Sequence, residues 1–226
     1  MKISFFTFLF LLQLQVLLAV EFKGKFEQGS FILGKTEPGS KVFIDKRKIR
    51  VSDQGFFAFG LDRDRKNDVT IRIQKDSNLE IIYKKVLKRE YKIQRIDGLP
   101  PKQVTPPPEV YERIKKDNKL IGQARSLDTS YDFFKGKFIY PIEKYVITGV
   151  YGSQRILNGK PRRPHYGIDF HAPEGTPVKA MMDGEVTLAE NDMYFTGGTL
   201  IFDHGHGTSA LSMHMKDIKV KVGQKV

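Results

Sequence analysis

The sequence contains no cysteine, and this absence excludes several kinds of site at once. Without a thiol the chain can form no disulfide, can bind no zinc through thiolates and cannot carry the lipid-modified cysteine of a lipoprotein. A zinc site in this chain would have to use imidazole and carboxylate ligands, and only five histidines are present.

An excess of acidic residues is also lacking. Lys and Arg number 38 against 26 Asp and Glu, which gives a formal net charge of +12. This balance favours an anionic partner such as a nucleic acid, a membrane surface or an acidic cell-wall polymer. The sequence has no basic helix with interleaved aromatic residues and no RNA-binding motif, so we do not expect nucleic acid as the partner.

The one long apolar run lies at the N-terminus. Lys2 precedes residues 3–20, which are almost entirely apolar and end near Ala19. The pattern is typical of a secretory signal peptide over residues 1–20, and it predicts export to the periplasm or cell envelope. The alternative is an uncleaved membrane anchor, although Gln13 and Gln15 weaken it. We therefore expect membrane contact only through this segment.

The remaining 206 of the 226 residues fall into three parts. Residues 21–97 hold short runs of alternating apolar residues separated by Gly and Asp, as in a small antiparallel β-sandwich. Residues 98–136 begin with a proline-rich linker and continue with the spacing of a short amphipathic helix. Residues 137–226 return to strand patterns. The sequence thus predicts an all-β protein with two β domains.

Three candidate metal ligands lie within the segment PHYGIDFHAPEGTPVKA, residues 164–180. They are His165, Asp169 and His171, and imidazole and carboxylate are common zinc ligands. Taken alone, the His-x-x-x-Asp pair is explained by a surface hydrogen bond, because such pairs often occur by chance. On a flat strand these two side chains would be about 13 Å apart. A shared ion therefore requires a bent chain, which Gly167 could permit.

Other histidines occur further along the chain. In the predicted strand around SALSMHM, alternation places Ser212 and His214 on one face. The sequence DHGHG, residues 203–207, offers His204 and His206 as a second pair of ligands. Its glycines, however, also suit a hairpin turn, and metal ligands are usually held on stiffer elements.

The order of several motifs then resembles a known family. These motifs are TGVYGSQR, HYGIDFHAPEGTPVKAMMDGEVTLAE, GGTLIFDHGHGTSALSMHM and VKVGQKV. Together they resemble the lysostaphin/LytM-type zinc metalloendopeptidases, which cut peptide bridges in peptidoglycan. The resemblance covers residues 137–226 and includes the Pro-x-Gly-Thr-Pro-Val stretch. It implies an antiparallel LytM-type β domain of the duplicated hybrid motif fold, with Zn²⁺ as cofactor and peptidoglycan peptides as substrate.

The resemblance also implies roles for individual residues. His165 and Asp169 match the first two zinc ligands of the family. His214 matches a histidine that is not a ligand and that stabilises charge at the reaction centre. His204 and His206 match no ligand, and the role of His171 stays open.

One feature of the family has no counterpart in this sequence. A second His-x-His motif supplies the third zinc ligand in the family, and it lies downstream of the strand that VKVGQKV resembles. We expect this ligand beyond Val226, in an enzyme of which the LytM-type domain is incomplete here. The alternative is a degenerate member, which would serve as a non-catalytic cell-wall-binding module or as an activator of a cell-wall amidase. Amidases and division proteins are accordingly the expected protein partners.

The N-terminal pattern leads to a first testable prediction. The mature protein should be exported and should begin near residue 20, because the apolar run ends near Ala19, a small residue of the kind found at signal-peptidase sites. N-terminal peptide mass spectrometry of fractionated cells checks this. Intact Met1 on a soluble cytoplasmic protein would contradict it.

Overall fold

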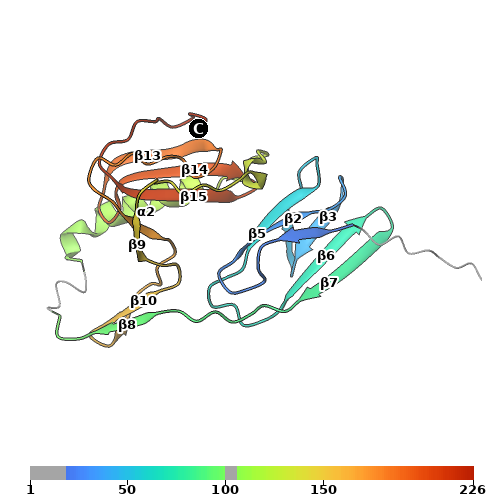
Figure 1. Ribbon diagram of the computed structural model, residues 1–226, viewed down its shortest axis with the longest axis horizontal. Coiled ribbons are helices and arrows are strands. Elements are labelled where there is room, and N and C mark those ends of the chain that lie inside the picture. The colour runs from blue at the N-terminus through green and yellow to red at the C-terminus, as the bar shows by residue number, and fades with distance from the viewer. Residues whose placement is uncertain (1–18, 100–105) are drawn as a thin grey trace, which may run out of the picture.

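The computed structural model describes residues 19–99 and 106–226, and the fold is mostly β, as predicted. Residues 1–18, which hold most of the predicted signal peptide, and residues 100–105 of the linker lie outside the described residues. Within the described ranges, no helix combines the length and the apolar character needed to cross a membrane. Figure 1 shows two β-rich parts joined along one side of the molecule.

The N-terminal part contains two antiparallel sheets. One has the order β1-β2-β5 and the other the order β4-β3-β6-β7. The strands are β1 (Glu21–Lys23), β2 (Phe31–Lys35), β3 (Lys41–Ile44), β4 (Arg47–Ile49), β5 (Phe56–Gly60), β6 (Val69–Lys75) and β7 (Asn78–Lys84).

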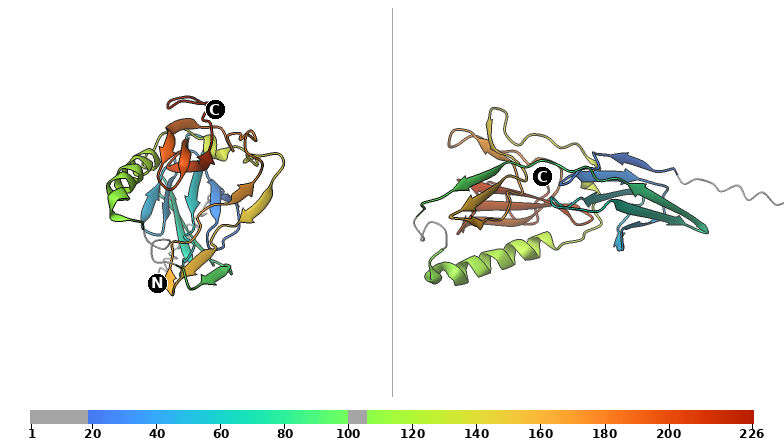
Figure 2. Two further views of the ribbon diagram at one scale, coloured as in Figure 1. Left: turned by 90° about the vertical axis from the view of Figure 1, so that its left-hand side faces the viewer. Right: turned by 90° about the horizontal axis from the view of Figure 1, so that it is seen from below.

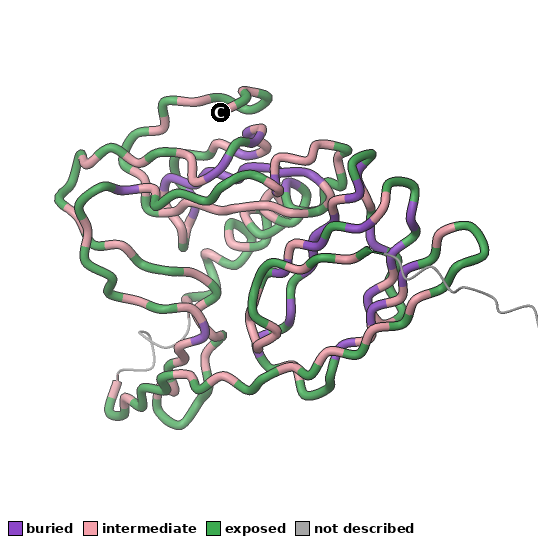
Figure 3. The backbone as a smooth tube through the Cα atoms, turned by 45° about the vertical axis from the view of Figure 1, so that its right-hand side comes forward, coloured by how far each residue is buried: buried purple, intermediate pink, exposed green. Residues whose placement is uncertain are grey.

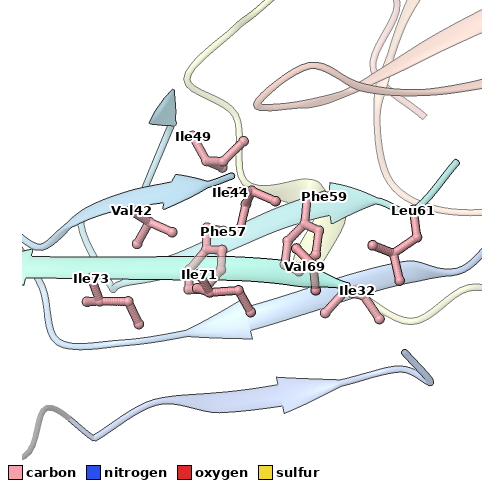
Figure 4. Packing of buried hydrophobic residues seen from close by; sticks show 10 residues of the cluster. All are labelled: Ile32, Val42, Ile44, Ile49, Phe57, Phe59, Leu61, Val69, Ile71 and Ile73. Carbon is pink, nitrogen blue, oxygen red and sulfur yellow. The ribbon is translucent and has the colours of Figure 1, made fainter. Parts of the chain in front are cut away.

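A single hydrophobic core joins these two sheets. Along β6 the apolar residues Val69, Ile71 and Ile73 are completely buried, because strand geometry turns alternate side chains to the same face. They pack in one cluster with Ile32 and Phe57 of the other sheet (Figure 4). The predicted small β-sandwich is therefore confirmed.

The linker leads into the predicted helix. A short 3-10 turn, η1 (Pro108–Val110), precedes α2 (Tyr111–Arg125), and a second turn, η2 (Phe133–Lys135), follows. The helix lies along one face of the C-terminal sheet (Figure 2). Leu120, Ile121 and Ala124 pack there against Leu188 and Ile201, so the apolar stripe of the helix is its contact surface.

The C-terminal sheet has three antiparallel strands in the order β13-β14-β15. They are β13 (Glu185–Met193), β14 (Gly197–Gly205) and β15 (Thr208–Met215). The central strand is buried on both faces: Ile201 meets the helix, while Leu200 and Phe202 meet Val220 and its neighbours. Buried residues are accordingly continuous along β14, whereas they alternate with half-buried ones along the sandwich strand β6 (Figure 3).

Smaller strand pairs precede the C-terminal sheet in the chain. β12 (Asp169–His171) pairs with β9 (Val146–Gly149), while β10 (Gln154–Leu157) pairs with β11 (Lys160–Pro161). β10 also pairs in parallel with β8 (Ile93–Ile96), which lies before residue 97 and so inside the predicted N-terminal domain. By its hydrogen bonds, β8 belongs with the C-terminal part.

Two segments within residues 137–226, where strand patterns were expected, are largely irregular. Residues 177–184 form no strand, since Lys179 and Met181 instead make single backbone hydrogen bonds to Pro141 and Ile139. The stretch VKVGQKV contributes one bridge, between Lys225 and Glu185.

Burial in the sandwich generates a stability prediction. Phe57 is fully buried, and a side chain on Gly34 would lie within 2.2 Å of its ring, so the site is closely packed. Phe57→Ala should lower the free energy of unfolding by about 3–5 kcal/mol. The matched control is Phe195→Ala, a 58% exposed ring, which should change it by less than about 0.5 kcal/mol. Urea unfolding curves measure both, and equal losses would contradict the proposed core.

Candidate metal centre

His165 is held by its backbone against a neighbouring turn. Its N–H donates to the Ser153 carbonyl at 2.8 Å, and its carbonyl accepts the Gly152 N–H at 2.7 Å. This pair of bonds attaches the segment before β12 to the turn Val150–Ser153, which follows β9. The position of His165 is therefore set by hydrogen bonds between two loops, without a hydrophobic core beneath it.

The structure brings the two predicted ligands together. His165 Nε2 lies 3.0 Å from Asp169 Oδ1, so the chain bends between them as the shared-ion hypothesis requires. The bend occurs at Gly167, but the φ angle of this residue is not in the left-handed region. An added Cβ there would also make only an ordinary contact at 3.6 Å. Gly167 therefore lies at the expected bend, although its backbone conformation and its surroundings do not require glycine.

Gly149 is the glycine that the site does require. It pairs with Asp169 across β9 and β12. A Cβ at position 149 would lie 2.1 Å from Asp169 Oδ2, which is closer than atoms approach without one of them moving. The absence of a side chain on β9 therefore makes room for the carboxylate beside His165.

The surroundings of the His165 ring fit a metal ligand. Nδ1 lies 3.3 Å from the Val150 carbonyl, and Nε2 faces the Asp169 carboxylate. A neutral imidazole that donates its Nδ1 proton to a backbone carbonyl presents an Nε2 lone pair, which is the usual arrangement of a metal-bound histidine. The lone pair then points at a carboxylate oxygen, and a cation between the two would satisfy both.

The described part of the chain places no third ligand beside His165 and Asp169. Across residues 19–99 and 106–226, no group of three or more His, Asp or Glu side chains could hold a metal ion. His171 is exposed on β12, two residues after Asp169. His165 and Asp169 are thus the two predicted ligands that the described residues bring together.

His214 lies at the end of β15, in an unusual backbone conformation. Its φ angle is 61°, in the left-handed region that residues other than glycine rarely adopt. The register of β14 and β15 shifts here: Gly198 pairs with Met215, whereas Leu200 pairs with Ser212. The extra residue forms a β-bulge and breaks the alternation predicted for Ser212 and His214. Such bulges re-aim side chains, and local strain of this kind is concentrated at functional sites.

Gly198 lies opposite this bulge, at a position where a side chain would not fit. A Cβ at this position would lie 2.1 Å from the Met215 carbonyl, so glycine allows β14 to approach the end of β15. Gly197, in contrast, has open space around it.

His204 and His206 occupy different surroundings from the pair. His204 is fully buried on β14, with Nδ1 2.7 Å from the Asp183 carbonyl. His206 and Gly207 form the two-residue turn between β14 and β15, with φ angles of 52° and 69°. The hairpin turn expected from the sequence is therefore confirmed, and the His206 ring packs against Phe134 at 4.8 Å.

Residues of the N-terminal part also reach the site, which the sequence did not indicate. Arg63 follows β5 and hydrogen bonds to Gly152, while Tyr91 packs beside Tyr151. A cavity of about 540 Å³ lies where the two parts meet, and its lining includes Arg63, Tyr151 and Tyr166. Positions so distant along the chain carry no local pattern that marks them as neighbours of His165.

Comparison with known proteins shows what this region is similar to. Residues 163–226 match Peptidase family M23, which confirms the predicted resemblance to LytM-type peptidases over this segment. Three curated relatives are similar to parts of the chain. Peptidoglycan DD-endopeptidase ShyA of Vibrio cholerae is 36% identical over 89 residues, which are 38% of this chain and 20% of that protein. Cell division protein DipM of Caulobacter vibrioides is 28% identical over 125 residues, which are 54% and 19% of the two chains.

The third relative is an uncharacterized metalloprotease of Buchnera aphidicola, 30% identical over 118 residues, which are 52% of this chain and 30% of that protein. The chain thus spans between 19% and 30% of the length of these three relatives. A crystal structure of a candidate peptidase M23 from Pseudomonas aeruginosa superimposes with a TM-score of 0.62 at 21% identity, over 89% of this chain and 79% of that one. That likeness confirms the fold.

His204, which is buried, and His206, which is half-buried, generate a prediction about acid stability. Burial lowers the pKa of His204 below its ordinary value of 6.5, and burial together with Arg50 lowers the pKa of His206. Below pH 6.5 the unfolded chain therefore binds protons that the folded chain does not yet bind. The free energy of unfolding should fall as the pH decreases from 6.5 toward the folded-state pKa, by up to about 1.4 kcal/mol per pH unit for each group.

Urea unfolding between pH 7 and pH 5 measures this effect. His204→Asn keeps a donor for the Asp183 carbonyl but removes the titrating ring, so it should flatten the pH dependence. The matched control His171→Asn changes an exposed ring and should leave the dependence as it is. An unchanged slope in His204→Asn would refute the assignment.

Proposed function

We propose that this protein is a zinc metalloendopeptidase that cleaves peptide bonds in peptidoglycan during remodelling of the cell wall. The observation that carries the proposal is the pair of His165 Nε2 and Asp169 Oδ1, 3.0 Å apart, inside the segment that matches Peptidase family M23. The orientation of the His165 ring toward the Val150 carbonyl supports a role as ligand.

The chain's own residues would divide the work as follows. His165 and Asp169 would hold the ion, and Gly149 would keep space for the carboxylate. A bound zinc supplies a Lewis acid and a water that loses its proton near neutral pH. His214 would donate a hydrogen bond or proton to the oxygen of the scissile carbonyl, where negative charge develops. Because His214 lies in the β-bulge of β15, its ring points in a different direction from the one that a regular strand would give it.

The charge of the chain supports a cell-wall substrate. A net charge of +12 attracts an anionic polymer and raises its concentration near the protein. The proposed location is the periplasm or cell envelope, which the N-terminal apolar run favours. ShyA, named as a peptidoglycan endopeptidase, supports the same substrate class.

A second function is favoured by a specific observation. The described residues bring two ligands together and no third, and a cation held by two protein ligands is weakly bound. A protein that keeps the fold without the chemistry would act as a cell-wall-binding module or as an activator of an amidase.

Activity measurements on the complete gene product distinguish these functions. Release of new amino termini from purified peptidoglycan reports cleavage, and zinc content after dialysis reports binding. His165→Ala should lose both, because it removes a ligand. His214→Ala should lower turnover by about 10²- to 10⁴-fold while zinc content is retained, because a general acid–base group is lost and no ligand.

The matched control is His171→Ala, an exposed histidine on the same strand as Asp169, which should keep zinc content. If His214→Ala loses zinc together with activity, His214 is a ligand and the assignment is wrong. If the wild-type protein binds peptidoglycan but releases no amino termini, with or without added zinc, the wall-binding function replaces the enzymatic one.

A further inference from the structure

Arg63 of the N-terminal part makes a buried contact with the turn that carries the metal centre. Its side chain is 7% exposed, and both Nε and Nη2 donate to the Gly152 carbonyl, at 2.8 and 2.6 Å. Hydrogen bonds from a charged guanidinium are stronger than those between neutral groups. Two such donors on one carbonyl oxygen hold this peptide group firmly.

Gly152 transmits this contact to His165. The φ angle of Gly152 is 84°, and the Ser153 N–H donates back to the Val150 carbonyl at 3.3 Å, as in a type II turn with glycine at its third position. The Gly152 N–H donates to the His165 carbonyl, and the first residue of the turn, Val150, faces His165 Nδ1. Gly152, which Arg63 holds, is thus hydrogen bonded directly to the proposed ligand His165.

Tyr91 packs against both Arg63 and Gly152. The Arg63 guanidinium lies 4.2 Å from the centre of the Tyr91 ring, at cation–π distance. The Tyr91 hydroxyl donates to the Arg63 carbonyl at 3.2 Å. A Cβ on Gly152 would lie 2.0 Å from the same ring. The turn therefore has no room to shift toward the sandwich.

We propose that Arg63 is a positioning residue for the metal centre, acting through Gly152 on the backbone and ring of His165. The N-terminal sandwich then forms part of the site, because it supplies the group that fixes the turn beside the first ligand. The inference rests on the proposed function, because only that function makes His165 a metal ligand. The contact between Arg63 and Gly152 does not depend on it.

Other contacts between the two parts differ from this one. Arg50 forms an ion pair with Asp128 at 3.0 Å, but both side chains are largely exposed and neither touches the turn. Arg65 lies two residues from Arg63 and is mostly buried, yet its guanidinium hydrogen bonds to Asp45, Asn67 and Asp68, which all belong to the sandwich. These two arginines provide matched controls, one for contact between the parts and one for a buried arginine in the same loop.

The test compares Arg63→Met with Arg50→Met and Arg65→Met. Amide hydrogen exchange is measured in the metal-free protein, and the ring ¹⁵N resonances of His165 are recorded. In Arg63→Met the Gly152 and His165 amides should exchange about tenfold faster, because a charge-assisted hydrogen bond that orders the turn is lost. The His165 ring resonances should shift, and both controls should leave these signals in place.

The amide of Ile71 reports the integrity of the sandwich core, where this residue is fully buried. Should Arg63→Met lose protection there as well, Arg63→Lys takes its place, since it keeps the charge but offers no planar fork of donors. Arg63→Lys should then restore the Ile71 amide and only part of the protection at His165. Unchanged exchange at Gly152 and His165 in a folded Arg63 variant would overturn the proposal, as would equal effects in Arg50→Met.

Cobalt(II) titration of the complete gene product adds a functional readout. Arg63→Met should weaken cobalt binding roughly tenfold, at the lower end of the loss seen when partners of metal ligands are removed. Failure of the two proposals can be told apart. If wild-type protein binds no cobalt but exchange at His165 still depends on Arg63, the positioning role stands and the proposed function fails. If cobalt binds and Arg63→Met changes neither affinity nor exchange, the positioning role fails alone.

Discussion

The C-terminal half of the chain depends on the burial of β14 on both faces. The helix α2 covers Ile201 on one face, and the segment that ends at Val226 covers Leu200 and Phe202 on the other. This three-layer arrangement turns a three-stranded sheet into a stable scaffold, because both faces lose contact with water. The neighbouring strand β15, and with it the bulge at His214, is positioned by its hydrogen bonds to β14.

The proposed metal ligands are not positioned by a hydrophobic core of this kind. His165 and Asp169 lie on loops and on the short pair β9–β12, where few side chains are buried. Their geometry comes from backbone hydrogen bonds to the turn Val150–Ser153, and that turn is in contact with Arg63 of the sandwich. A precise site needs such outer support, because loops alone do not hold ligands to within a fraction of an ångström.

The histidines illustrate how far sequence reasoning reached. The segment around His165 and Asp169 could be identified because ligand residue types were crowded among prolines and glycines. The turn at His206-Gly207 could be identified from its glycines. The bulge at His214 could not, because a one-residue shift of register depends on how Gly198 meets Met215 across two strands. Gly167 was chosen for the bend on local grounds, whereas the close contact that demands glycine occurs at Gly149 on another strand.

The sequence by itself determined the all-β class, the strands β3, β6, β14 and β15 and the helix after the prolines. These features follow from alternation, helical spacing and turn residues, which act between neighbours in the chain. Only the tertiary structure decided that β8 pairs with β10 and that Arg63 reaches Gly152, 89 positions away. Such contacts leave no periodic trace, because they depend on how separately folded parts pack against each other.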